Sequence, residues 1–343
     1  MQFSWKACSR EMCLTELQKE NAPVLNAELL SFEQALGGNH TPFLPDVPDF
    51  SFTEKGTAES ADALLCRFSN AIDGMLAGEA AAKNSAPIRL RALTQADYIQ
   101  LPLLTLEAYR HGIGIPEMLD GWDSWIADAT APEKILCTAV KDGCPIEKLG
   151  AFQAFSSYAS DMRIVQRAMC WALPYACQPQ KAAQFACLDA YTSTRGSMLI
   201  AAALFAAAIS CAFRMPPQEA VRTAIYGMPS DFAKCCDPNR CADPAAFENL
   251  IEQQCSIFLH TIQTSHSAEE CFERLSSLRA DPCCFIAAGA VYGAASFHPA
   301  DPEADCIPTR LAYSESVSKE ELSLRLLQIT SPILFRQNAP WED

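Results

Sequence analysis

One stretch of the chain restricts its fold more than any other. Residues 197–213, "SMLIAAALFAAAISCAF", carry no charged side chain and are apolar on every side of a helix. A helix of that kind has to be surrounded by other elements. The stretch is also rich in alanine and shorter than the roughly 20 residues that a membrane span needs. It therefore predicts a helix buried at the centre of a domain, with no membrane as a partner.

Helical patterns lie on both sides of this stretch. In residues 61–78 apolar side chains recur every three to four positions, as on one face of a helix; they are Leu64, Leu65, Phe68, Ile72, Met75 and Leu76. Capping boxes mark further helix starts at Thr130, Ser267 and Ser318, each followed three positions later by Glu. No segment alternates apolar and polar residues as a strand does. We predict an all-α domain over residues 61–343, with about ten or more helices.

The first part of the chain has a different character. "NHTPFLPDVPDFSFTEKG" holds three prolines and breaks any helical period. We therefore predict that residues 1–60 form an N-terminal extension or irregular arm. The start of the chain shows no secretory signal pattern, which favours a cytoplasmic location.

Charge and cysteine content narrow the choice of partners. There are 26 Lys and Arg against 41 Asp and Glu, a formal charge of -15, so a nucleic-acid partner is not expected. The 17 cysteines are interpreted as reduced thiols that act as small apolar groups. Cys235, Cys236 and Cys241 form the densest group, but paired C-x-x-C motifs of a zinc site are absent, and whether this group binds anything stays open.

Seven segments, taken in order, resemble the ADP-ribosylglycohydrolase family in its bacterial branch. They are "RFSNAIDGMLAGEAAAKN" (67–84), "ADYIQLPLLTLEAYRHG" (96–112), "EKILCTAVKDGCP" (133–145), "YASDMRI" (158–164), "DAYTSTRGSMLIAAALFAAAISCAF" (189–213), "FLHTIQT" (258–264) and "ADPCCFIAAGAVYGA" (280–294). The resemblance implies an ADP-ribosylglycohydrolase-like all-α domain with the alanine-rich helix at its centre. It also implies a cleft in which two magnesium ions promote hydrolysis of the bond between ADP-ribose and a protein or small molecule.

The acidic motifs of the family are missing from this chain. Where the resemblance places a run of aspartates, the chain has Leu93, Thr94 and Gln95. Where it places the second motif, the chain has Ala280, Asp281, Pro282 and Cys283, and Thr194 replaces a histidine. Alanine and proline side chains cannot coordinate magnesium. We therefore predict that the two-magnesium site, and with it the family's cofactor, is lost.

Six residues remain as candidates for binding a ligand: Asp97, Asp161, Arg163, Arg195, His260 and Asp281. Arg163 and Arg195 have the guanidinium geometry that suits phosphate, although surface ion pairs would explain them equally. Asp97 and Asp161 are either a carboxylate pair for metal-free acid/base hydrolysis or ordinary helix-start and surface residues. His260 is either a cleft residue or a core histidine bonded to a backbone carbonyl.

Two cysteines and the catalytic role complete the predictions. Cys283 and Cys284 are either a nucleophile at a helix N-terminus or buried packing thiols. No catalytic residue is assigned. Three hypotheses follow: a pseudoenzyme that binds an ADP-ribose-like molecule or a protein partner, an active hydrolase with a rebuilt cleft, or an assembly component that docks through residues 1–60.

Overall fold

The computed structural model describes residues 61–85, 95–110, 132–142, 161–191, 193–194, 197–228, 233, 250–296, 306–307, 317–319 and 321–327. Residues 1–60, for which an arm is predicted, lie outside these ranges, as do Arg195 and the group Cys235, Cys236 and Cys241. The labelled helices are α4 (Ala61–Ser85), α5 (Gln95–Arg110), α7 (Pro132–Lys141), α8 (Arg163–Ala168), the 3-10 helix η4 (Met169–Ala172), α9 (Pro179–Tyr191), α10 (Ser197–Ala212), α11 (Pro217–Tyr226), α13 (Leu250–Thr264), α14 (Ala268–Ser277) and α15 (Pro282–Ala295).

The described part of the chain is mostly helical, which confirms the all-α class. Two strands of two residues each, β1 (Cys306–Ile307) and β2 (Val317–Ser318), pair antiparallel with Cys306 opposite Ser318. They are too short to show a period in the sequence, and residues 321–327 after them are helical. None of the described helices is both long and apolar enough to cross a membrane.

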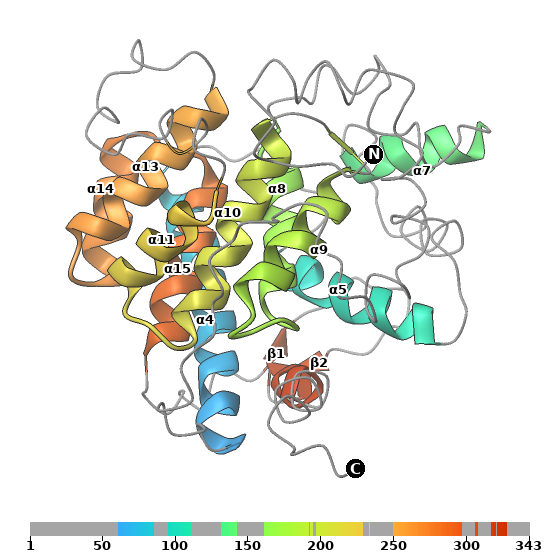
Figure 1. The fold of residues 1–343 in the computed structure, drawn as a ribbon, viewed down its shortest axis with the longest axis horizontal. Coiled ribbons are helices and arrows are strands. Elements are labelled where there is room, and N and C mark those ends of the chain that lie inside the picture. The colour runs from blue at the N-terminus through green and yellow to red at the C-terminus, as the bar shows by residue number, and fades with distance from the viewer. Residues whose placement is uncertain are drawn as a thin grey trace, which may run out of the picture.

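Helix α10 lies in the middle of the molecule, as the sequence predicted (Figure 1). It packs against α9 and α8 on one side and against α11, α13 and α15 on the other. Every residue from Met198 to Ala212 is buried, and the ring of Phe205 stacks on that of Phe258 in α13 at 4.2 Å between centroids. Helix α10 is apolar on every side, and the helices around it accordingly cover it on every side.

The most extensive contact between described elements joins α4 to α15. A Cβ atom built on Gly74 would overlap the carbonyl oxygen of Gly289, and one built on Gly289 would overlap the carbonyl of Gly74. Gly78 and Gly293 meet backbone of the opposite helix in the same way. These four glycines bring the two backbones together at a distance that no side chain permits.

The helix start predicted at Ser267 agrees with the structure, whereas Thr130 lies outside the described residues and the Glu133 carboxylate predicted to complete its capping box accepts from Arg167 instead. The Ser267 hydroxyl accepts a hydrogen bond from the backbone N–H of Glu270 at the start of α14. The Glu270 carboxylate in turn accepts one from the backbone N–H of His266, at 2.8 Å. The capping box predicted at Ser267 is therefore present, with the returning bond one residue earlier than the motif prescribes.

Candidate functional site

Gln95 and Cys283, one from each of the two segments where the resemblance places acidic motifs, both contact the 3-10 helix η4. Gln95, the first residue of α5, is fully buried. Its side-chain nitrogen donates to Cys170 Sγ at 3.2 Å and to Met75 Sδ at 3.7 Å. From the other segment, the Cys283 thiol contacts Met169 Sδ at 4.0 Å. We call the sulfur atoms of these four residues, together with the Gln95 amide, the sulfur-lined contact.

These donors do not fit magnesium. A magnesium site needs several oxygen ligands, commonly carboxylates, whereas thioether and thiol sulfur favour softer metals. The oxygen of the Gln95 amide already accepts from Gln166 Nε2 at 2.8 Å. Burial also raises the pKa of the Cys170 thiol far above its ordinary value, despite a lowering by the Gln95 hydrogen bond, so this sulfur stays neutral. Among the described residues, no group of three His, Cys, Asp or Glu side chains is placed to hold a metal.

Asp281 caps helix α15. Its carboxylate accepts a hydrogen bond from the backbone N–H of Cys283 at 2.8 Å, and its own backbone N–H donates to Gln254 Oε1 at 2.7 Å. The next two cysteines, Cys283 and Cys284, are fully buried. Burial raises the pKa of Cys284 well above its ordinary value, which favours the packing interpretation of this thiol over the nucleophile.

A buried charged cluster lies where α5, α7, α8 and α9 approach one another. We call it the Arg167 cluster, and its members are Tyr98, Glu133, Arg167, Asp189 and Ser193. The Arg167 guanidinium donates to Glu133 Oε1 and to Asp189 Oδ1, both at 2.7 Å, and to Ser193 Oγ at 3.0 Å. The side chains of Arg167 and Glu133 are 0% exposed. One guanidinium thus joins three segments that are far apart in the sequence.

The charge of Arg167 is maintained by its partners. Burial alone lowers the pKa of a guanidinium, because it penalises the charged form. The carboxylates of Asp189 and Glu133 outweigh burial, and the net effect is a pKa above the ordinary value. Asp189 is held further by Trp171, whose indole N–H donates to Asp189 Oδ2 at 3.0 Å. Tyr98 contributes a weak hydroxyl contact to Glu133 Oε1 at 3.5 Å.

Asp161 and Arg163 form the more exposed edge of this region. Arg163 donates from Nη2 to Asp161 Oδ2 at 2.6 Å and from Nε to Oδ1 at 3.0 Å, and both side chains are about a fifth exposed, at 19% and 18%. Burial lowers the pKa of Arg163, but Asp161, Tyr98 and Glu133 raise it above the ordinary value. Arg163 therefore lies within the electrostatic field of the Arg167 cluster.

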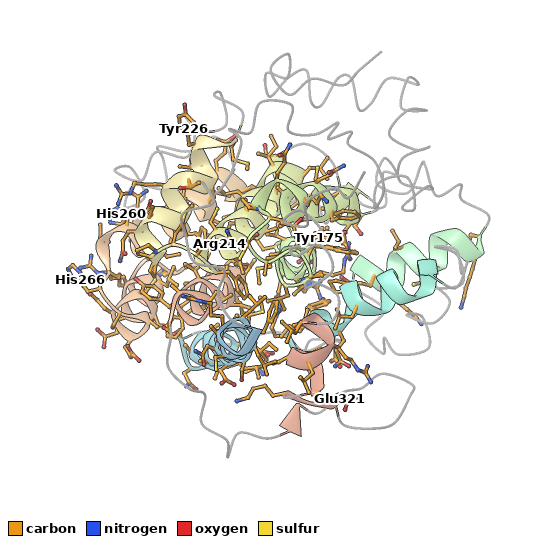
Figure 2. All side chains as sticks on the ribbon, turned by 60° about the horizontal axis from the view of Figure 1, so that its bottom comes forward. Tyr175, Arg214, Tyr226, His260, His266 and Glu321 are labelled. Atoms are coloured by element: carbon orange, nitrogen blue, oxygen red, sulfur yellow. The ribbon has the colours of Figure 1, made fainter. Side chains whose placement is uncertain are left out.

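The structure groups some of the candidate residues and separates others. Asp97 is fully buried in the first turn of α5, next in sequence to Tyr98 of the Arg167 cluster. Asp161 and Arg163 are linked to the same cluster electrostatically, because Tyr98 and Glu133 raise the pKa of Arg163. His260 is on α13, at the opposite side of the molecule from α5 and α7, and half-buried (Figure 2). Asp281 is engaged at the start of α15. Arg195 lies outside the described residues.

Sequence reasoning missed the residues at the centre of the cluster. In the sequence, Glu133 belongs to a capping box and to a segment of the resemblance, Asp189 begins another such segment, and neither these patterns nor any other assigns a functional role to them or to Arg167. One signal was available: Arg167 stands alone in the otherwise uncharged run from Ile164 to Cys177. A single charged residue in such a run requires a buried partner of opposite charge, although the sequence does not say which one.

Comparison with known proteins gives no relative for this chain. No protein-family model matches it, and no curated protein or solved structure matches it either. The class of protein that fold and site define is therefore a helical domain built around a buried central helix, with a fully buried ionic cluster beside it.

Proposed function

We propose that this chain is an ADP-ribosylglycohydrolase-like pseudoenzyme: it has lost the two-magnesium hydrolase site and binds an ADP-ribose-like small molecule. The observation that carries the proposal is the sulfur-lined contact. Gln95 stands where the sequence resemblance expects a metal-binding carboxylate, and Cys283 directly follows the stretch from Ala280 to Pro282, where the resemblance expects two more. Gln95 and Cys283 contact neighbouring residues of one 3-10 helix.

The contacts of Gln95 and Cys283 with one 3-10 helix support the resemblance and the loss together. The two residues are about half the chain apart in sequence, yet both touch η4, Gln95 through Cys170 and Cys283 through Met169. Two motifs that shared metal ions would have to converge in this manner. Their side chains now make packing and amide contacts, so the scaffold is kept while the hard oxygen ligands are gone.

The abundance of reduced, buried thiols supports a cytoplasmic location in this proposal. Nine cysteines among the described residues are buried thiols. Disulfides are rare in that compartment because its thiols are kept reduced.

A thermal-shift experiment tests the proposal. ADP-ribose is titrated against the full chain in the presence of magnesium and, separately, of EDTA. Ligand that binds only the folded state raises its stability by RT ln(1 + [L]/Kd). We expect the same rise in melting temperature under both conditions, because no carboxylate-held metal takes part in binding.

Two results would contradict the proposal. If ADP-ribose up to millimolar concentration does not shift the melting temperature, ADP-ribose is not the ligand. A shift that requires magnesium, accompanied by release of free ADP-ribose from a modified arginine or serine peptide, would instead establish an active hydrolase with a rebuilt cleft.

A further inference from the structure

We infer that Glu133 is a ligand-binding residue, and that its Oε2 atom accepts a hydrogen bond from a hydroxyl group of the terminal ribose, the one that carries no adenine, rather than lying near a phosphate. The inference rests on the proposed function, because it takes an ADP-ribose-like molecule as the ligand. It goes further by naming the residue and the part of the ligand that meet.

Only one oxygen of the Glu133 carboxylate accepts hydrogen bonds from the described residues. Oε1 accepts from Arg167 Nη1 at 2.7 Å and from the Tyr98 hydroxyl at 3.5 Å. Oε2 is buried and has no hydrogen-bond partner among the described residues. A buried carboxylate oxygen without a donor is costly, and native proteins nearly always supply one. A ligand that brings a donor would remove this cost.

The charges around Glu133 determine which group of the ligand can lie beside Oε2. Arg167 is shared between Glu133 and Asp189, and Arg163 is paired in two contacts with Asp161. These ion pairs contain three carboxylates but only two guanidinium groups, so negative charge is in excess. A phosphate placed beside Glu133 Oε2 would meet this excess of negative charge, whereas a hydroxyl donates without adding charge. Pairing of an acidic side chain with ribose hydroxyls recurs in dinucleotide-binding proteins.

The direction of approach follows from exposure. Glu133 and Arg167 are 0% exposed, whereas Asp161 and Arg163 are about a fifth exposed. Arg163 is electrostatically coupled to Glu133 and Tyr98, and its pair with Asp161 is more exposed than Asp189, a cluster member that is itself 11% exposed. A ribosyl group would reach Glu133 from the side of this pair, with its phosphates pointing outward.

The Glu133→Gln variant tests the inference through the sign of its effect. Glutamine keeps an oxygen for Arg167 but replaces the charged acceptor by an amide. If a hydroxyl donates to Oε2, calorimetry should show about tenfold weaker binding of ADP-ribose, since hydrogen bonds to charged groups are the stronger ones. If a phosphate lies there instead, removing a negative charge should strengthen binding, and the inference is overturned.

Two controls separate this inference from the proposed function. Glu321→Gln removes a carboxylate from an exposed pair with Arg325 and should leave ADP-ribose affinity unchanged. Unchanged affinity in Glu133→Gln overturns the inference while leaving the proposed function standing, whereas failure of the wild-type chain to bind ADP-ribose overturns both.

A measurement on the wild-type chain covers the case in which Glu133→Gln does not fold. ADP has one ribosyl group fewer than ADP-ribose and the same two phosphates. We expect ADP to bind at least about tenfold more weakly, as loss of a charge-assisted hydrogen bond predicts. Equal affinity for the two molecules would overturn the inference.

Discussion

The contact between α4 and α15 and the Arg167 cluster join helices in opposite ways. In the first, Gly74 and Gly289 remove every side-chain atom so that two backbones touch. In the second, long charged side chains cross the space between helices, and one guanidinium binds two carboxylates. The first contact depends on size alone, and the second on charge balance, so the two should fail under different substitutions.

This difference teaches which parts of the chain are available for a new role. A backbone contact leaves no side chain that could be turned to a ligand. The cluster carries a carboxylate oxygen, Glu133 Oε2, that the described protein does not use. Packing regions preserve the fold, whereas a charged region of this kind provides chemistry at the cost of stability.

The largest expected effect comes from breaking the charge balance. Arg167→Met leaves Glu133 and Asp189 buried without their shared cation, and loss of one partner from a buried ion pair costs about 3–5 kcal/mol. Urea denaturation should show this fall in the free energy of unfolding. Arg325→Met is the matched control: its pair with Glu321 is about half exposed, at 49% and 50%, and should be worth less than about 1 kcal/mol. Equal effects of the two substitutions would contradict the buried cluster.

The second expected effect tests the backbone contact. In an open helix Gly→Ala stabilises by about 1 kcal/mol, but Gly74→Ala puts a methyl group into the carbonyl of Gly289. Overpacking of this kind costs about 1–3 kcal/mol. The sign of the change in unfolding free energy therefore decides the matter. A stabilised Gly74→Ala protein would show that α4 and α15 are farther apart than described.

A smaller effect is expected at the start of α15. Asp281→Ala removes the side chain that accepts from the Cys283 backbone N–H, and loss of such a cap costs about 1 kcal/mol. Asp281→Asn should restore most of the stability, because an amide oxygen also caps. If Asp281 held a ligand instead, both variants would lose ADP-ribose binding in calorimetry, and Asn would rescue stability without rescuing affinity.

The smallest effect concerns a carboxylate on the surface of α14. The backbone N–H of His266 and the Arg274 guanidinium hold the pKa of Glu270 below its ordinary value. A carboxylate with a lowered folded-state pKa stabilises the fold above its unfolded-state pKa, and this contribution is lost as pH falls through the folded-state value. Carbon-13 NMR titration of Arg274→Met should show a higher pKa for Glu270. An unchanged pKa of Glu270 would show that Arg274 does not lower it.

The sequence predicts packing far better than it predicts the site. The central helix and the buried face of α4 follow from the period of apolar residues, a local property. The glycines of α4 and α15 are visible in the sequence, but their pairing is not, because it depends on how distant segments meet. The Arg167 cluster is harder still: the sequence indicates a buried Arg167, but its partners come from distant segments, and Glu133 and Asp189 each resemble an ordinary surface charge. Asp281 is predicted as a candidate ligand-binding residue. Its role as a helix cap depends on a single hydrogen bond from the backbone N–H of Cys283.

The pairing of α4 with α15 also has a consequence for synthesis of the chain. Arg67 Nη1 donates to the carbonyl of Ala294 at 2.7 Å across 227 positions of sequence. A ribosome that adds about 5–20 residues per second needs roughly 10–45 s to cover that distance. For that time the apolar face of α4, with Phe68, Ile72 and Met75, has left the ribosome before its main partner exists. We expect this early helix to be the segment that chaperones hold on the nascent chain.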